Sequence, residues 1–288
     1  MSVRAHPFDA RERGAAIVLA LSVVALAALA ASAMMMSQSV WIRQIELSDG
    51  RTQGQFLIQA GLDWARAVLS YNSHASGVDS LDEPWAMRLP PVPLENGSLA
   101  GYLEDQQARF NLNNLVRNGK IDLPQIETFR RLLSSLGLHP VLADMLADSI
   151  AAGGRPLVDV SELARLSDFD EGTRARLQPF VTVLPRFTAV NVNTAAPEVL
   201  AAVVDGLGLD GARALVAERN RAYFRSTSEF LDRLPNNATV PTGAISVSSS
   251  YFMATIDANI GDAHARGVAL LVRDELGGWP AVVWRKYL

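Results

Sequence analysis

Residues 15–42 read AAIVLALSVVALAALAASAMMMSQSVWI, and this stretch decides the architecture of the N-terminal part of the chain. It contains no charged residue, and its polar residues are Ser22, Ser32, Ser37, Gln38 and Ser39. A helix of this length would be about 42 Å long, which exceeds the hydrocarbon layer of a bilayer. The stretch therefore predicts one membrane-spanning helix.

The residues before this helix predict its orientation. Arg4, Arg11 and Arg13 precede it, together with Asp9 and Glu12. Positive charge before an apolar helix favours a cytoplasmic N-terminus. The rest of the chain is then expected on the other side of a bacterial inner membrane, in the periplasm, behind a single span.

Three interpretations of this segment are open on its residues alone. It can be a signal anchor that holds an exported domain. It can be a secretory signal peptide, because Ala31-Ser32-Ala33 fits the small-x-small cleavage pattern. It can also be a prepilin-type leader, cut between Gly14 and Ala15 so that the apolar helix is kept.

Composition excludes several classes of protein. The chain has 288 residues, no cysteine and a formal net charge of -4. The absence of cysteine excludes disulfides, Cys-ligated zinc, iron–sulfur clusters and thiol nucleophiles. The charge argues against a non-specific nucleic-acid binder, which needs a basic face. We find no Gly-x-Ser-x-Gly, Walker or dinucleotide motif, so we predict that the protein is not an enzyme.

Residues 43–71 continue the helix in an amphipathic form. Apolar residues recur there at near-helical spacing: Phe56, Ala60, Trp64, Ala67 and Leu69. Gly50, Gly54 and Gly61 weaken the helix without excluding it. An apolar helix that runs on as an amphipathic helix is the shape of pilin subunits, in which the second half lies against a globular head.

The body begins with a segment rich in proline, residues 72–96, which we expect to be a loop. Residues 97–105 and 108–112 are strand candidates, and so are residues 244–257, 265–274 and 279–284. Helical patterns fill the part between them. Strands, a helical block and further strands predict an α+β fold with a helical domain inserted into an antiparallel sheet.

The helical block contains an internal repeat. Asn111-Leu112-Asn113 resembles Asn191-Val192-Asn193, and an amphipathic helix is expected after each, at 124–136 and 196–207. Each helix then reaches a Leu-Gly-Leu sequence, at Gly137 and Gly208, and a second helix follows, at 139–151 and 210–221. The pattern is helix-hairpin-helix-like, and we expect the asparagines to satisfy backbone groups where the strands end.

Helix-hairpin-helix units often bind DNA phosphates, but the charges argue against that here. Residues 190–235 contain five arginines, six acidic residues and no lysine. A phosphate-binding hairpin normally carries excess positive charge. A membrane-anchored helix-hairpin-helix protein that binds DNA is therefore the alternative hypothesis, and a structural, protein-contacting module is the main one.

The chain resembles the minor pseudopilin K family of type II secretion systems over nearly its whole length. The segments that carry the resemblance are Arg13-Gly14, Glu104-Asp105 followed by Phe110-Asn111-Leu112-Asn113, Val160-Ser161-Glu162-Leu163, Pro179-Phe180-Val181, Val190 to Leu200, and Arg225 to Phe230. The order and spacing of these segments identify the family more specifically than any single segment does.

This resemblance implies a non-catalytic subunit at the tip of the periplasmic pseudopilus, which helps to initiate and cap it for protein export across the outer membrane. It implies cleavage after Gly14 by prepilin peptidase, N-methylation of Ala15, and minor pseudopilins I and J as partners, with no nucleic acid. Most pilin-like subunits carry glutamate at the fifth mature position, where this chain has Leu19. Since that acid is costly in apolar surroundings unless a neighbour pairs with it, its loss suits a tip subunit.

Calcium is the one cofactor that the resemblance raises, and none is required. Related chains have an acidic loop after the helix equivalent to residues 139–151. Here the matching run keeps Asp148 alone, which argues against calcium at that place. Asp168 and Asp170 form a nearby acidic pair and complete the weak candidates.

The predicted organisation has six parts. They are a leader at 1–14, a transmembrane and assembly helix at 15–42, its amphipathic continuation at 43–71, a first part of a pilin-like sheet at 72–112, an inserted helical domain at 113–240, and a second part of the sheet at 241–288.

Overall fold

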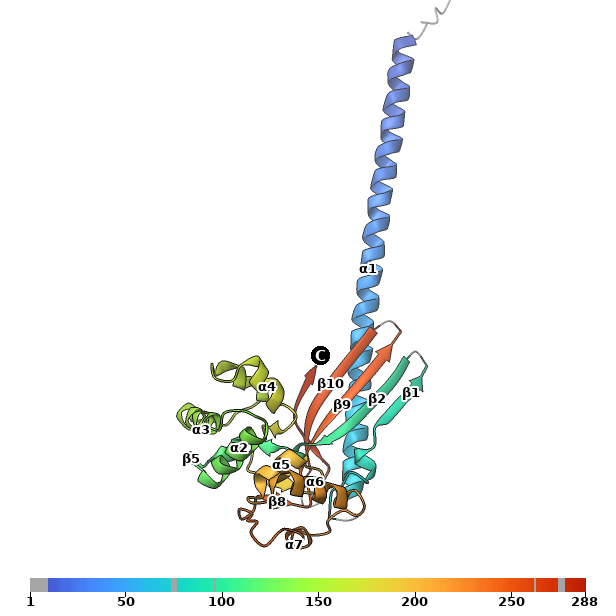
Figure 1. Cartoon of the computed structure of the whole chain (residues 1–288). Coiled ribbons are helices and arrows are strands. Elements are labelled where there is room, and N and C mark those ends of the chain that lie inside the picture. Colours follow the sequence, from blue (N-terminus) through green and yellow to red (C-terminus); the bar gives the residue numbers. More distant parts are fainter. Residues whose placement is uncertain (1–9, 74–76, 96, 262, 274–277) are drawn as a thin grey trace, which may run out of the picture.

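A computed structural model describes residues 10–73, 77–95, 97–261, 263–273 and 278–288, with backbone alone for residues 10–16, 39, 40, 42–49, 51, 72 and 73. The first element is a single helix, α1 (Ala10–Ser73), of 64 residues. At 1.5 Å per residue it is about 96 Å long. Its first half projects beyond the head, and its second half lies along a sheet (Figure 1).

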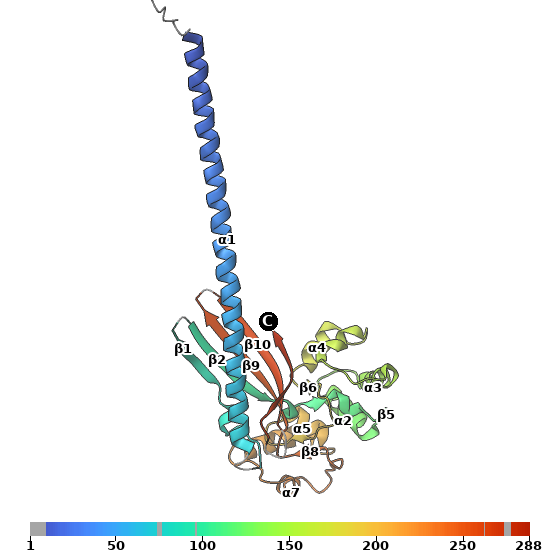
Figure 2. The same ribbon diagram turned by 180° about the vertical axis from the view of Figure 1, so that it is seen from behind.

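The sheet has 5 strands in the order β1-β2-β9-β10-β11. The strands are β1 (Leu89–Leu94), β2 (Gly97–Asp105), β9 (Tyr251–Ile260), β10 (Ala263–Val272) and β11 (Ala281–Tyr287). All neighbours are antiparallel, and β2 pairs with β9 so that Asp105 lies opposite Phe252. The α+β prediction is confirmed. Figure 2, seen from behind, shows α1 across one face of this sheet.

Strand β1 corrects the prediction of a loop at residues 72–96. It contains Pro90, Pro91 and Pro93, which cannot donate a backbone hydrogen bond. Proline is tolerated in a strand at the edge of a sheet, where the missing N–H faces solvent. Since β1 is the outermost strand beside β2, its prolines are compatible with pairing. The short 3-10 helix η1 (Pro84–Ala86) precedes it.

The face of α1 that packs on the sheet differs in part from the predicted one: Leu69 is buried and Trp64 is partly buried, but the other three predicted positions are not. Phe56 is 72% exposed, and Ala60 and Ala67 are exposed as well. The buried positions are Gly54, Ile58, Gly61, Leu62, Ala65 and Leu69. They repeat at helical spacing too, and they pack against Leu103, Phe252, Ile256 and Leu271 of the sheet.

Glycines explain how closely this face approaches the sheet. A Cβ atom placed on Gly61 would lie 2.6 Å from Ile256 Cγ2, and one on Gly267 would lie 2.3 Å from Ile58 Cγ2. Helix and strands therefore approach each other through glycine on both sides. Their small size, which weakens the helix on its own, allows close packing on the sheet.

The helical insert leaves the sheet after β2 and returns to it at β9. Its helices are α2 (Leu123–Ser135), α3 (Leu142–Gly153), α4 (Glu171–Leu177), α5 (Pro197–Val203), α6 (Gly208–Arg219) and α7 (Thr227–Leu231). Its 3-10 helices are η2 (Gln106–Ala108), η3 (Leu112–Leu115) and η4 (Val160–Arg165). Short strands complete it: β3 (Phe110–Asn111), β4 (Val116–Arg117), β5 (Lys120–Ile121), β6 (Val181–Thr182), β7 (Val190–Asn191) and β8 (Ile245–Ser246).

The insert has its own core, separate from the core under α1. It includes Phe110 and Phe129, which stack at 5.4 Å, and Phe224 and Phe230, which meet edge to face at 5.2 Å. Burial of these large apolar side chains is the main stabilising term for the insert. A few residues, among them Leu184, Tyr251 and Leu270, form the contact between insert and sheet.

The two Leu-Gly-Leu sequences are not structurally equivalent. Gly137 follows the end of α2 with a left-handed φ of +67°, and the N–H of Leu138 donates to the carbonyl of Leu133. Gly208 has the same left-handed φ of +67°, but it begins α6, five residues after α5 ends at Val203. The predicted helix at 196–207 was therefore too long.

Two predicted strands are also shorter than expected. Residues 244–257 divide into β8 and β9, because the segment between them turns into the junction described below. Residues 108–112 keep only β3, between two 3-10 turns. β3 pairs with β6, and β7 pairs with β8, each in parallel.

Candidate functional site

The apolar half of α1 exposes many large hydrophobic side chains to solvent. A candidate membrane span runs from Ile17 to Gln38, 22 residues with a mean hydropathy of 2.5, and none of its most apolar window is buried. Leu19 is 70% exposed and Met35 75% exposed. An exposed apolar surface of this size requires lipid or another protein around it.

Two serine side chains in this span are satisfied inside the helix. The hydroxyl of Ser22 donates to the carbonyl of Val18 at 2.9 Å, and that of Ser32 donates to the carbonyl of Ala28 at 2.8 Å. A hydroxyl bonded to the preceding turn needs no water, so it can enter an apolar environment at low cost. These serines are thus compatible with a helix surrounded by lipid or by other helices.

The predicted cleavage residues Gly14 and Ala15 lie within α1, where the structure describes the backbone alone. Leu19 lies one turn further on and makes the helix surface apolar at that point. Cleavage, methylation and the role of Leu19 therefore stay predictions.

A first asparagine junction, formed by Asn111, Asn113 and Asn114, holds the insert together. The side chain of Asn113 donates to the carbonyl of Leu157 and accepts from its N–H, both at 2.9 Å. Asn111 accepts from the N–H of Leu184 at 3.0 Å. All three asparagines are buried, so their amides replace backbone pairing where β3 ends.

A second asparagine junction, formed by Asn191 and Asn193, repeats this chemistry. Asn193 donates to the carbonyl of Phe224 and accepts from its N–H, again both at 2.9 Å. Asn191 accepts from the N–H of Asn193, as Asn111 does from that of Asn113. The backbone-satisfying role expected for the Asn-x-Asn repeat is thus present twice.

The side chain of Asn191 also donates a hydrogen bond to the carboxylate of Asp105 at the end of β2. That carboxylate accepts from Asn191 at 3.1 Å, from the hydroxyls of Thr194 and Ser249 at 2.6 Å each, and from the N–H of Gln107 at 2.8 Å. Burial raises its pKa to about 6, and the hydrogen bonds oppose this rise. One acidic side chain therefore joins the sheet to both ends of the insert.

A buried ion pair completes this charged network of Asp79, Asp105 and Arg273. The guanidinium of Arg273, at the end of β10, pairs with Asp79, which follows α1. Their side chains are 9% and 3% exposed. Ser249 connects the two carboxylates, because its N–H donates to Asp79 at 2.7 Å and its hydroxyl donates to Asp105. The network ties together α1, the sheet and the insert.

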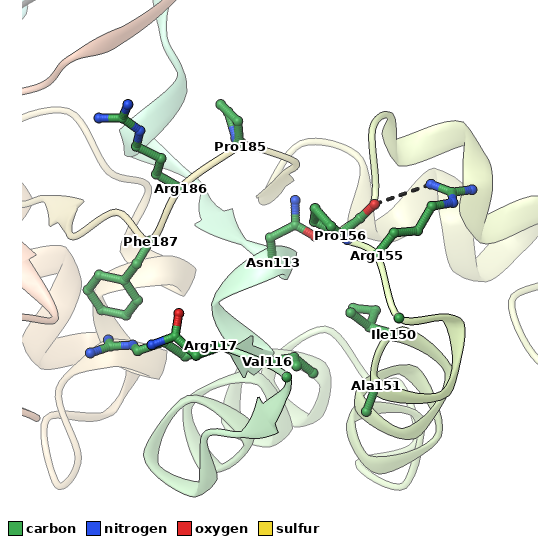
Figure 3. A pocket seen from close by; sticks show the side chains of 13 residues that line it. Asn113, Val116, Arg117, Ile150, Ala151, Arg155, Pro156, Pro185, Arg186 and Phe187 are labelled. Carbon is green, nitrogen blue, oxygen red and sulfur yellow. Dashed lines mark hydrogen bonds between the residues drawn. The ribbon is translucent and has the colours of Figure 1, made fainter.

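A cleft of about 480 Å³ lies beside the first asparagine junction (Figure 3). Asn113, Val116, Ile150 and Ala151 face it, and Arg117 stacks under Phe187 at 3.8 Å from the ring centre. Its lining, as far as the structure describes it, has no carboxylate, histidine, serine or threonine. These residues offer neither a nucleophile nor a general base.

The calcium candidates do not come together in the described part of the chain. Asp148, Asp168 and Asp170 are exposed. Asp170 caps α4 by accepting from the N–H of Thr173 at 2.7 Å, which lowers its pKa. No group of three or more histidine, aspartate or glutamate side chains among the described residues is placed to hold a metal. Since calcium needs six to eight oxygen ligands, these residues do not fit it.

Comparison with known proteins begins with two family models, both described as "Type II secretion system (T2SS), protein K". One matches residues 108–153 and the other residues 190–248. Each match begins at or just before one of the asparagine junctions. The two halves of the insert are thus the parts that the family models match.

Full-length relatives agree. The chain is 31% identical to the type II secretion system protein K of Pseudomonas aeruginosa over 303 residues, which covers 92% of this chain and 90% of that protein. This chain belongs to the type II secretion system protein K family. The protein K of Klebsiella pneumoniae is 28% identical, with 96% of this chain and 97% of the relative covered. Nothing in these matches supports the DNA-binding alternative.

A solved relative supports the fold. The chain resembles one chain of the structure titled as the GspK-GspI-GspJ complex from enterotoxigenic Escherichia coli, with a TM-score of 0.73 at 23% identity. The likeness covers 85% of this chain and 99% of that chain. The predicted family is therefore confirmed by sequence, and its architecture by structure.

Sequence reasoning missed the charged network as a unit. Asp105 stood in the segment that carried the family resemblance, but Asp79 lies in a stretch read as a loop and Arg273 near the end of a strand. A signal did exist for Asp105, because it lies six residues before the first Asn-x-Asn in the segment that carries the resemblance. Nothing local identifies the other members of the network, Asp79, Asn191, Ser249 and Arg273, which come from four separate segments.

Proposed function

We propose that this chain is a non-catalytic minor pseudopilin at the tip of a type II secretion pseudopilus, where it helps to initiate and cap the fibre. We place α1 in the bacterial inner membrane before assembly, as a single span, with the head in the periplasm. Membership of the protein K family supports the proposal.

One observation carries the proposal: the exposed apolar half of α1 continues without a break into the half that packs on the sheet. A removable signal peptide has no need of rigid continuity with the folded head. A subunit that passes from membrane to fibre does need it, because the same helix must anchor the subunit and then pack against its neighbours. Both environments are apolar, so one surface serves for both.

The partners follow from the family. The solved relative is titled as a complex of GspK with GspI and GspJ. We infer that this chain assembles with minor pseudopilins I and J, and that prepilin peptidase cuts after Gly14 and leaves Ala15 at the mature N-terminus. Helix-to-helix packing of α1 would hold the complex in the membrane, and the head would add contacts outside it.

Purification of the protein from its own membrane tests the cleavage. Mass spectrometry is expected to find an N-terminus at methylated Ala15, and pull-down is expected to recover pseudopilins I and J. An N-terminus at Met34 would show an ordinary signal peptide and refute the assembly proposal. An intact Met1 would leave a signal anchor and refute processing.

Leu19 tests the position at the tip. With no subunit ahead of it, a carboxylate at this position lacks an N-terminal ammonium partner and stays unpaired in apolar surroundings. Leu19→Glu is expected to lower secretion several-fold, measured as exported protein in the medium, whereas Leu19→Ala leaves secretion close to wild type. Equal secretion by the two variants would contradict a tip position.

A further inference from the structure

The two edges of the main sheet differ in their capacity to pair with another chain. At one edge, β1 carries Pro90, Pro91 and Pro93, which remove backbone donors. At the other edge, β11 has no proline from Ala281 to Tyr287, and β10 is its partner on one side alone among the described residues. One edge is therefore blocked and the other is open.

The hydrogen bonds of β11 show which of its groups point outward. Leu288 exchanges both backbone hydrogen bonds with Arg266, at 2.8 and 3.5 Å. In an antiparallel ladder this pattern alternates, so Lys286 faces β10 in the same way, opposite Val268. The N–H and C=O of Arg285 and Tyr287 then point away from the sheet. Both residues are exposed, Tyr287 at 43%.

A groove of about 980 Å³ continues along the start of this edge. Ala281 and Val283 of β11 line it together with Trp279, and Tyr251 and Arg186 also reach it. Its described lining contains hydroxyl groups and arginines but no carboxylate. Arg186 lines both this groove and the cleft of Figure 3. Burial raises the pKa of the Tyr251 hydroxyl, and the charge of Arg186 opposes that rise.

The charges along the edge are positive and partly unmatched. Arg285 donates to the neutral side chain of Gln59 at 2.7 Å, and neither it nor Arg186 forms an ion pair with any described residue. Lys286 is paired with Asp159 of the insert. A partner strand with acidic side chains on the face of α1 would supply a carboxylate near Arg285, while Arg186 keeps the groove on the opposite face positive.

We propose that β11 is a docking edge for an extended, acidic segment of a partner protein, which adds to the sheet as a sixth strand. Main-chain hydrogen bonds to Arg285 and Tyr287 would provide affinity, and the cations would select acidic sequences. Docking at β11 does not require α1 to pack in a pseudopilus. It can therefore be tested independently of the proposed role at the tip.

Binding of labelled octapeptides to the full chain in mild detergent tests it. A fluorescein-labelled peptide of alternating Thr and Glu is expected to bind, and a matched peptide of alternating Thr and Lys at least tenfold more weakly. The Thr–Glu peptide with alternate backbone nitrogens methylated is expected to lose binding as well, since it cannot pair along an edge. Equal binding of the acidic and basic peptides would overturn the proposal.

Variants at two positions separate backbone pairing from charge. Tyr287→Pro removes an outward N–H and no bond to β10, so it is expected to weaken binding about tenfold relative to Tyr287→Thr, which loses the same ring. Arg285→Gln is expected to weaken binding about fivefold, and Arg213→Gln on α6 not at all. Equal affinities of Tyr287→Pro and Tyr287→Thr would exclude strand addition.

Hydrogen exchange gives a readout that needs no variant. The amides of Arg285 and Tyr287 are expected to exchange rapidly in the free protein and to become protected when the Thr–Glu peptide is bound. Binding without that protection would place the peptide elsewhere and refute the assignment. Sedimentation that shows dimers competed apart by the peptide would assign the edge to a second copy and refute the acidic partner.

Discussion

The two asparagine junctions use the same local chemistry for different purposes. Asn113 and Asn193 each bind the backbone of a distant residue, Leu157 or Phe224, with the same pair of 2.9 Å hydrogen bonds, and Asn113 also donates to the carbonyl of Leu184. Around them the surroundings differ. Asn111 bonds to neutral groups of the insert alone, whereas Asn191 reaches Asp79 and Asp105 outside it.

This difference shows where the buried charges of the molecule lie. The first junction closes a loop within one core and is neutral. The second lies where the insert meets the sheet, beside the charged network of Asp79, Asp105 and Arg273. A further buried cation, Arg219 of α6, donates to the carbonyl of Val192 between the two asparagines at 2.7 Å. A buried ion pair adds little net stability to the fold, but the fold loses much stability when one partner of the pair is removed. Such a pair therefore favours one arrangement of the insert relative to the sheet. The comparison therefore predicts larger and more widespread effects at the second junction.

The largest effect is expected from Arg273→Met. This variant leaves the carboxylate of Asp79 buried without its cation, which typically costs about 3–5 kcal/mol. Urea denaturation of the full chain in detergent, followed by near-UV circular dichroism, measures the loss in the free energy of unfolding. Arg213→Met is the matched control, because its pair with Asp210 is exposed and contributes about 0–1 kcal/mol. Equal losses would show that the ion pair is not structurally important.

Asp105 predicts a dependence on pH. Its folded pKa of about 6 lies above the unfolded value of about 3.9, so the native state binds the proton more tightly. Protonated Asp105 therefore stabilises the folded state. This contribution is present below about pH 4, is lost as the pH rises through about 6, and is absent at higher pH.

Comparison with Asp105→Asn isolates this effect, because every other group titrates in both proteins. From pH 4 to pH 7 the wild type is expected to lose about 2 kcal/mol of unfolding free energy relative to the variant. Chemical denaturation at a series of pH values measures it. A difference that does not vary with pH would mean that the carboxyl group has an ordinary pKa.

Asn191→Ala and Asn111→Ala test the two roles directly. Each variant leaves several buried groups without partners and is expected to cost about 2–3 kcal/mol. Hydrogen exchange separates them: Asn191→Ala is expected to raise exchange in both the insert and β9, and Asn111→Ala in the insert alone. The same exchange pattern from both variants would remove the distinction between the junctions.

The smallest effects test the equivalence of Asn113 and Asn193. Asn193→Ala is expected to cost about 1–2 kcal/mol, because it loses one pair of hydrogen bonds to Phe224, and Asn113→Ala slightly more, because it also loses the bond to the carbonyl of Leu184. The two losses are expected to add in the double variant, since the sites have no shared partners. Urea denaturation of the three variants checks this. Losses that differ by more than twofold would contradict the structural equivalence.

Much of the architecture followed from local patterns. The uncharged stretch at residues 15–42 predicted the apolar helix, and the repeated Asn-x-Asn predicted side chains that satisfy backbone groups. These predictions succeeded because hydrophobicity, helix length and amide chemistry act over short segments. The asparagine spacing also indicated two related halves of the insert, which the family models match separately.

Other features were fixed by tertiary contacts alone. The sheet-facing side of α1 follows Gly54 and Gly61 because size at the contact, not apolarity, limits how close Ile256 can lie. The strand β1 forms despite three prolines because it lies at an edge. No local pattern contains the neighbour that decides either outcome.

What the sequence by itself determined is the class of the protein: an apolar helix that must be covered, and an α+β head with a repeated helical insert. Only the tertiary structure decided which residues join these parts. Asp79, Asp105, Asn191 and Arg273 lie far apart along the chain, and each is an ordinary polar residue on its own. They become a single network because β2 pairs with β9 across the whole insert, which brings both ends of the insert to one buried point.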